Sequence, residues 1–226
     1  MIGVGVRTLD DVIVRRYSCR SFLEDPVPMD TIRAVLTLAQ RTPSWCNTQP
    51  WQVHLVMGDA VPRFSGALVE QATTRGERAD LVTPEEYVGV YKARRREAGI
   101  TLYRSLGIER DDVAGRVAQA NRNLTFFGAP HVAVITTDRG HGAYGTVDCG
   151  GYVSTLLLAL ESRGVGAIPQ AAIALYSDAV RSFLDLPDDR LVVCAVAFGF
   201  ADDGHPANGF RTARAELTEV LHVVDH

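Results

Sequence analysis

Hydrophobic residues gather in three short runs that predict the strands of a sheet. Residues 191–200 read LVVCAVAFGF, a continuous apolar run that predicts a strand buried on both faces. Residues 131–137 read HVAVITT and predict a second strand, because β-branched residues are frequent in the run. Residues 51–56 read WQVHLV and alternate in character, which is typical of a strand with two different faces.

Apolar residues near the start of the chain recur at helical spacing. Thr8 is a suitable cap for a short helix over residues 9–14, and Asp30 is a suitable cap for a second helix. This second helix must end before Pro43. Residues 60–74 suit a third helix.

The most apolar helical segment lies in the second half of the chain. Residues 146–164 are apolar nearly all round and end at Gly164, the residue type that commonly terminates a helix. We expect a central buried helix here, preceded by a helix that ends near Phe127. Ser177 is expected to cap a later helix, whereas residues 167–173, AIPQAAI, are expected to be short and irregular.

Residues 75–116 differ from the rest of the chain in their charge. They carry nine basic and eight acidic side chains, a mixture typical of exposed helices. Tyr87 and Tyr91 are four residues apart, which predicts that they lie on one side of a helix. We expect this segment to be a helical excursion laid over the core. The whole chain, 1–226, is therefore predicted to be one α+β domain.

Composition and charge exclude several classes of protein. Lysine and arginine (23) nearly balance aspartate and glutamate (27), which gives a net charge of −4 and no basic footprint for nucleic acid. No apolar run approaches the roughly 20 residues that span a bilayer, and the first residues do not match a signal peptide. We therefore expect a cytoplasmic protein that binds neither nucleic acid nor a membrane.

The usual catalytic motifs are missing from the sequence. There is no complete glycine-rich nucleotide fingerprint, no serine-hydrolase elbow and no histidine or cysteine cluster for a metal. The four cysteines form no C-x-x-C pair and are expected to be reduced thiols: Cys19, Cys46, Cys149 and Cys194. If the protein is an enzyme, a bound cofactor must carry the chemistry.

Residues 15–22, RRYSCRSF, hold three arginines and no acid. If the segment is extended, Arg16, Ser18 and Arg20 point to one side, and two guanidinium groups and a hydroxyl suit a phosphate. The intervening residues then face the other way: Arg15, Tyr17 and Cys19. The alternative is a solvated, charged turn.

Two other segments offer related chemistry. Residues 43–51, PSWCNTQPW, place amides and aromatic rings between prolines, which suits the edge of a heterocycle. The alternative is a loop that only stops a helix, with Trp51 starting a core strand. Near the end of the chain, FRTAR adds Arg211 and Arg214.

These motifs together resemble the flavin-dependent nitroreductase family. The stretches RRYSCRSF, RTPSWCNTQPWQVHLV, FFGAPHVAVITT, GVGAIPQAAIALYSDAVRSFLDLPDD, VVCAVAFGFAD and NGFRTARAEL follow in the family's order. The resemblance implies an α+β fold with a central, mostly antiparallel sheet flanked by helices. It also implies an intertwined homodimer with FMN at the interface.

The resemblance assigns flavin-binding roles to twelve positions. They are Arg16, Ser18 and Arg20 in the N-terminal motif; Pro43, Ser44, Trp45, Asn47 and Gln49 in the loop that reaches the flavin from the partner subunit; Pro169 and Gln170 beside the ring; and Arg211 or Arg214 near the phosphate. The related halotyrosine deiodinases commonly carry an acid at the position of Gln49, which argues against that branch.

The resemblance implies an FMN-dependent NAD(P)H oxidoreductase. It would reduce nitroaromatic, quinone or related conjugated acceptors by a ping-pong mechanism, with NADH or NADPH as hydride donor. No side chain is assigned as a catalytic acid, because water or substrate can supply protons. Reductive dehalogenation, flavin fragmentation and a non-enzymatic flavin-binding protein stay open as alternatives on the same fold.

Overall fold

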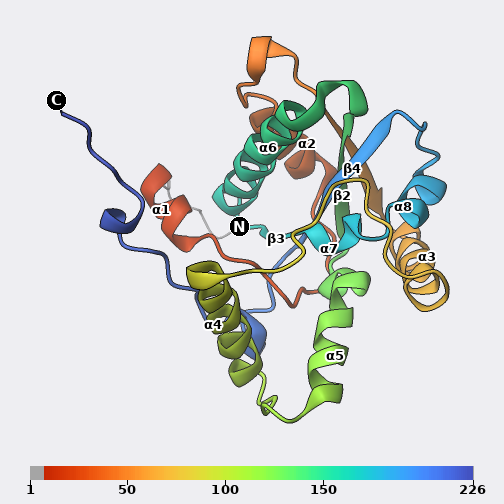
Figure 1. The fold of residues 1–226 in the computed structure, drawn as a ribbon. Coiled ribbons are helices and arrows are strands. Elements are labelled where there is room, and N and C mark those ends of the chain that lie inside the picture. The colour runs from red at the N-terminus through yellow and green to blue at the C-terminus, as the bar shows by residue number, and fades with distance from the viewer. Residues whose placement is uncertain (1–7, 226) are drawn as a thin grey trace.

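The computed structural model describes residues 8–225 and has an α+β fold around a four-stranded sheet (Figure 1). The strands lie in the order β1-β2-β4-β3, and all neighbouring pairs are antiparallel. Their bounds are β1 Trp51–Met57, β2 His131–Asp138, β3 Gly166–Gln170 and β4 Arg190–Gly199. The central antiparallel sheet expected from the sequence is therefore confirmed.

The two most apolar runs form the two inner strands. β2 is buried over all but its last residue, and β4 is buried at every position except Val193 and Cys194. Their register pairs Val132 with Ala197 and is interrupted by an irregularity between Ile135 and Thr136. Burial on both faces, predicted for residues 191–200, follows because helices cover both sides of the sheet.

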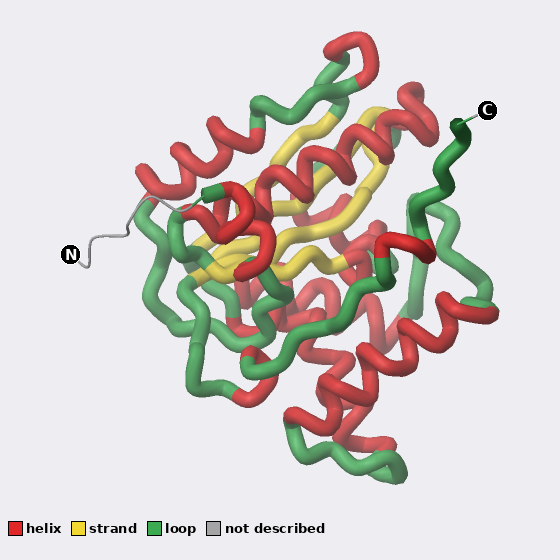
Figure 2. The backbone as a smooth tube through the Cα atoms, turned by 90° about the vertical axis from the view of Figure 1, so that its left-hand side faces the viewer, coloured by secondary structure: helices red, strands yellow, loops and turns green. Residues whose placement is uncertain are grey.

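Each face of the sheet has its own hydrophobic core. Helices α2 (Met29–Ala39) and α6 (Gly142–Ser162) cover one face, where Trp51 stacks on Tyr152 at 5.0 Å between ring centroids. Helices α3 (Ala60–Thr74) and α8 (Ser177–Leu184) cover the other (Figures 1 and 2).

Two helices project beyond the sheet. They are α4 (Gly89–Ser105) and α5 (Val113–Asn121), which follow the irregular segment 75–88 (Figures 1 and 2). α4 buries none of its residues. The predicted helical excursion is present from Gly89 onward, but Tyr87 precedes α4, so its expected place on one helix side with Tyr91 is wrong.

Two expectations about helix ends are confirmed. Helix α1 (Leu9–Arg15) begins after Thr8, whose hydroxyl oxygen accepts the Asp11 N–H at 3.2 Å. At the end of α6, Gly164 has a φ of 71°, a left-handed conformation that glycine adopts without strain. α5 is followed by tight turns over Arg122–Gly128, close to the expected helix end at Phe127.

Two predicted helix caps are wrong. α2 begins after Pro28, so Asp30 lies in its first turn, where its charge still favours the helix. Ser177 is the first residue of α8, and its hydroxyl donates to the Ala174 carbonyl at 2.8 Å.

Residues 166–170 are a strand, and the expectation of an irregular segment over AIPQAAI is wrong there. β3 is an edge strand, so Pro169 lacks an N–H where the strand can spare a donor. The short helix α7 (Ala171–Ala174) follows directly.

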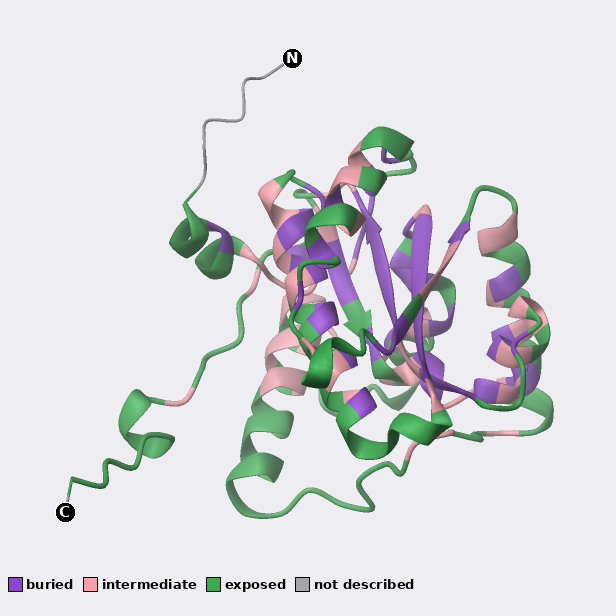
Figure 3. Ribbon diagram, turned by 90° about the horizontal axis from the view of Figure 1, so that it is seen from above, coloured by how far each residue is buried: buried purple, intermediate pink, exposed green. Residues whose placement is uncertain are grey.

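The last part of the chain is a tail that runs away from the sheet (Figure 3). It contains two short turns, Pro206–Asn208 and Leu217–Glu219, and most of its side chains are exposed. In its first part, residues 206–214, the tail passes beside the segment that follows α1.

Candidate functional site

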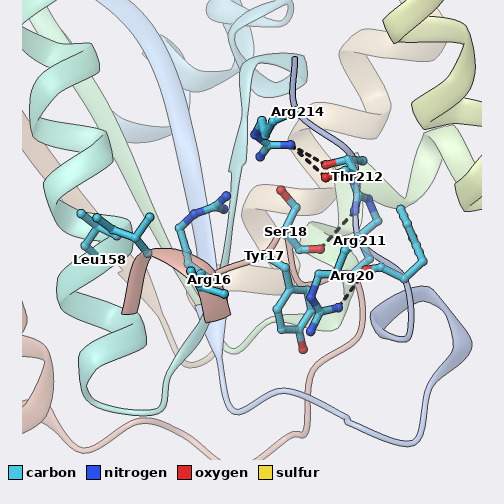
Figure 4. Close-up of a pocket in the computed structure, with 11 residues that line it drawn as sticks. Arg16, Tyr17, Ser18, Arg20, Leu158, Arg211, Thr212 and Arg214 are labelled. Carbon is cyan, nitrogen blue, oxygen red and sulfur yellow. Dashed lines mark hydrogen bonds between the residues drawn. The ribbon is translucent and has the colours of Figure 1, made fainter. Parts of the chain in front are cut away.

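Residues 16–20 and residues 210–214 form opposite walls of one cavity (Figure 4). The cavity has a volume of about 410 Å³ and is completed by α1 and by Leu158 of α6. In Figure 4, the side chains of Arg16, Ser18 and Arg214 point toward the same space. The structure thus brings together two sequence segments that are almost 200 positions apart.

The residues around the cavity are strongly cationic. Among the described residues, its wall contains four arginines, Arg16, Arg20, Arg211 and Arg214, and no acidic residue. Burial lowers the pKa of Arg16, and the nearby charge of Arg214 lowers it further. Glu161 lies outside this wall, and its charge acts on Arg16 to raise the pKa, more weakly than Arg214 lowers it. Burial also lowers the pKa of Arg20. Guanidinium groups that repel one another in a wall without acids favour a bound anion, and a phosphate fits this donor set.

Backbone contacts hold the N-terminal wall against the sheet. Ser18 forms a parallel bridge with Ala167 of β3, and the Cys19 N–H donates to the Ala167 carbonyl at 3.0 Å. The Arg20 N–H donates to Asn208 Oδ1 at 2.8 Å. The segment is therefore extended, as the phosphate interpretation requires.

Asn208 fixes the tail to this wall, a role that the sequence analysis missed. Its amide donates to the carbonyls of Ser21 and Asp202, each at 2.9 Å. Arg211 in turn donates to the Asn208 carbonyl and lies over the ring of Tyr17 at 3.8 Å. The dipeptide Asn-Gly in NGFRTAR is a turn signal that points to this residue.

The alternation predicted for residues 15–20 holds except at Tyr17. Tyr17 lines the cavity beneath Arg211, so its expected orientation away from the site is wrong. Arg15 lies outside the cavity wall, with its Nε 3.6 Å from Glu161 Oε1. Cys19 is fully buried, and its thiol donates to the Ser21 carbonyl at 3.1 Å.

A second cavity, of about 280 Å³, adjoins the first. Arg20 lines both, so one elongated ligand can occupy the two together. One side of the second cavity is formed by Pro169 and Gln170 at the end of β3. Gln170 is buried, and its Nε2 donates to the Asn123 backbone carbonyl at 2.9 Å.

The other side of the second cavity comes from the projecting helices. α4 contributes Leu102 and Tyr103, and α5 contributes Gln119. Within the part of the chain that the structure describes, no carboxylate, histidine or thiol lines this cavity. Apolar side chains beside carboxamides suit an aromatic ring with polar edges.

The proline-bounded loop lies apart from both cavities within this chain. The Trp45 side chain is 60 % exposed and its ring lies 4.4 Å from that of Tyr144. The Trp45 N–H donates to the Asp148 carboxylate at 3.2 Å, and Ser44 Oγ accepts the Gln49 N–H at 2.9 Å. The flavin-binding roles expected for Pro43, Ser44, Trp45, Asn47 and Gln49 therefore need a second copy of the chain.

The loop also carries unusual backbone strain. Three of its residues that are not glycine have a positive φ: Cys46 at 51°, Asn47 at 56° and Gln49 at 47°. The Cβ atom of any residue other than glycine disfavours this conformation, and folds tend to keep such strain at functional sites. The strain therefore favours a binding role for the loop over a loop that only stops a helix.

Metal chemistry finds no support in the described chain. Across residues 8–225, no group of three or more histidine, cysteine, aspartate or glutamate side chains is arranged to hold a metal ion. His131 has a structural role, since its Nε2 accepts the Val27 N–H at 2.9 Å. No helix within this range is long and apolar enough to cross a membrane.

Comparison with known proteins agrees with this arrangement. The family model described as "Nitroreductase family" matches residues 13–200. The nitroreductase NfnB of Mycolicibacterium smegmatis is 38 % identical over 209 residues, which cover 92 % of this chain and 89 % of that protein. A 4-nitrobenzoate reductase of Pseudomonas putida is 30 % identical over 213 residues, 94 % of each chain.

A solved structure extends the similarity to the whole fold. The crystal structure of the FMN-dependent nitroreductase NfnB from Mycobacterium smegmatis in complex with NADPH superposes with a TM-score of 0.91. The two sequences are 37 % identical, and the match covers 96 % of this chain and 97 % of that one.

Proposed function

The chain belongs to the nitroreductase family, and we propose that it is an FMN-dependent enzyme that reduces nitroaromatic compounds with NADPH or NADH. The net reaction is ArNO₂ + NAD(P)H + H⁺ → ArNO + NAD(P)⁺ + H₂O, a two-electron reduction. A ping-pong order and reduction of quinones are part of the proposal. So are a cytoplasmic location and the action of residues 1–226 as one FMN-binding domain.

The observation that carries the proposal is the pair of adjoining cavities with different chemistry. The first has four arginines and no acid, which fits the phosphate of FMN. The second combines apolar side chains with the buried carboxamide of Gln170 at the end of β3, which fits a flavin ring. Arg20 lines both cavities, so its positive charge lies where the phosphate-bearing chain joins the ring.

The residues of this chain have three tasks in such a reaction. FMN, when bound, accepts a hydride from the nicotinamide and passes reducing equivalents to the acceptor. Arg16, Ser18 and Arg214 bind the phosphate, and Arg20 stabilises negative charge that develops on the ring. Leu102 and Phe127 exclude water from the second cavity. We assign no side chain as the proton donor, because the substrate, or solvent that enters with it, can supply protons.

A homodimer completes the proposed site. The loop at Pro43–Gln49 lies apart from the cavities of its own chain, so it is free to reach the flavin of a second copy. Apolar side chains are exposed near this loop, on α1 and along the tail: Leu9, Ile13, Val14, Trp45, Tyr144, Val147, Leu217, Val220, Leu221, Val223 and Val224. Apolar surface of this extent favours burial against a partner. Light scattering of the purified protein tests the dimer, and a monomer that holds FMN at full affinity would contradict it.

Spectroscopy and steady-state kinetics test the proposed activity. The purified protein should be yellow, with a flavin band near 450 nm, and 4-nitrobenzoate or nitrobenzene should stimulate oxidation of NADPH. Failure of the purified protein to bind added FMN would contradict the proposal. Flavin binding without stimulation by any acceptor supports a non-enzymatic flavin protein, and stoichiometric loss of FMN in air supports flavin fragmentation. Release of halide from a halogenated aromatic, without nitro reduction, supports dehalogenation.

A further inference from the structure

Helix α5 buries a polar residue and exposes apolar ones. Gln119 is 7 % exposed and is the one buried residue of α5, whereas Val113 and Val117 are 60 % and 53 % exposed. An ordinary surface helix has the reverse pattern. Burial of apolar side chains within this chain does not explain why α5 turns Gln119 inward, toward the second cavity that Gln119 lines.

The buried amide of Gln119 has an unused donor. Within residues 8–225, five buried side-chain nitrogen or oxygen atoms have no hydrogen-bond partner. Gln119 Nε2 and Gln170 Oε1 are two of them, and both residues line the second cavity. The other three belong to residues of β2 and β4. Such orphan groups are rare in native proteins and call for a partner.

The other carboxamide donors around this cavity are engaged. Asn123 Nδ2 donates to the Ala120 carbonyl at 2.9 Å, and Gln170 Nε2 donates to Asn123. Arg20 Nη1 donates to the Ser18 carbonyl at 3.1 Å. The last torsion of a glutamine side chain is broad, so a small rotation brings the Gln119 N–H to a ligand in the cavity.

We propose that Gln119 donates a hydrogen bond to the nitro group of the acceptor and so favours nitro compounds over other oxidants. The inference rests on the proposed function, which puts the flavin ring beside Pro169 and Gln170, across the same cavity from α5. A nitro oxygen is a weak acceptor at first and gains negative charge as electrons arrive. A fixed N–H donor therefore stabilises the later stages of the reaction more than the bound substrate.

The test separates the two half-reactions of the FMN-loaded enzyme by stopped-flow absorbance. We compare the wild type with Gln119→Leu and Gln119→Met, which remove the donor at similar size. Reoxidation of the reduced enzyme by nitrobenzene should slow about tenfold, the effect of one lost hydrogen bond. Reduction by NADPH and reoxidation by ferricyanide should change less than about twofold. Asn121→Leu is the matched control, because Asn121 is an exposed carboxamide on the same helix.

A pH series with Gln119→Glu tests whether the rate of reoxidation recovers at low pH. A purely structural role of Gln119 would not produce this recovery. A carboxyl group donates a hydrogen bond only when protonated. Gln119→Glu should therefore reoxidise slowly with nitrobenzene above the pKa of its carboxyl group, which burial raises, and faster below it, while Gln119→Leu should stay slow throughout.

Binding and stability measurements complete the test. The melting temperature and FMN affinity of Gln119→Leu should match or exceed those of the wild type, because the variant loses an unsatisfied donor. The inference is overturned if Gln119→Leu slows reoxidation by nitrobenzene and by ferricyanide equally, or if it weakens FMN binding. It is also overturned if Gln119→Leu leaves reoxidation by nitrobenzene unchanged while Tyr103→Phe slows it. A wild-type protein that binds no FMN would contradict the proposed function itself.

Discussion

The two sides of the second cavity are built in different ways. One side comes from β3 and from Arg20, whose segment 16–20 is hydrogen-bonded to β3 and to Asn208. The opposite side is formed by α4 and α5, of which α4 buries nothing and α5 buries Gln119 alone. On the proposed function, cofactor binding and acceptor recognition therefore depend on parts of the cavity that are buried to different extents. Changes in α4 and α5 should alter substrates without loss of the fold.

The sharpest contrast in stability should lie between the sheet and α4. Phe64 is fully buried and stacks with Phe126 at 5.4 Å and Phe183 at 4.9 Å, measured between ring centroids. Phe64→Ala should reduce the free energy of unfolding by about 3–5 kcal/mol. Val90→Ala on exposed α4 should change it by less than about 0.5 kcal/mol. Urea unfolding measures both, and a comparable loss at Val90 would mean that α4 belongs to the cooperative core.

The next largest effect is expected on the affinity for FMN, which should depend on the arginine-bearing segment 16–20. Arg16→Ala and Arg20→Ala should each raise the dissociation constant of FMN by about tenfold or more, since each removes a charge-assisted hydrogen bond. The double variant should lose FMN on gel filtration. Arg15→Ala is the matched control and should bind FMN normally. Unchanged affinity in the double variant, titrated by flavin fluorescence, would refute the assignment of these arginines.

Alkaline pH should reduce the free energy of unfolding through Cys19, which lies in the segment bound to β3. Burial raises the pKa of Cys19 from 9.0 to about 11, so its thiol stays neutral in the folded protein at pH values where an unfolded chain ionises. Its contribution to stability is complete below about pH 9 and is lost as the pH rises to about 11. Urea unfolding across this range should show a shallower decline for Cys19→Ala. The same decline in both proteins would assign the effect to other groups.

A small effect is also expected where α4 meets the tail. Arg94 Nη2 lies 3.0 Å from Glu219 Oε2, and both side chains are largely exposed. Exposed ion pairs contribute little, so Arg94→Ala should change the free energy of unfolding by less than about 1 kcal/mol. A larger loss in thermal unfolding would show that the tail and α4 stabilise each other.

A local sequence pattern was sufficient to predict several helices and strands. β2 and β4 are continuous apolar runs, α1 has a Thr8 cap, and Gly164 stands two positions after Ser162, the last residue of α6. Each element therefore carries its signal in a few neighbouring residues. β3 was missed because Pro169 normally opposes a strand. Its tolerance depends on the place of β3 at the sheet edge, which no local pattern reveals.

The residues of the site also differ in whether a local sequence pattern predicts them. Arg16, Ser18 and Arg20 share a short extended segment, so their spacing alone predicts a common side. Asn208 is held by hydrogen bonds to distant parts of the chain, and only the Asn-Gly turn signal of NGFRTAR points to it. Gln119 stands in no motif at all. Gln119 in particular looks like a solvent-facing residue until the orientation of α5 is known.

The bridge between Ser18 and Ala167 has a consequence outside catalysis. An open strand edge offers unpaired backbone groups to other chains and invites aggregation. Residues 18 and 19 occupy part of the free edge of β3, and Pro169 removes one of its donors. The segment that presents the arginines thus also keeps the sheet from growing out of one molecule into the next.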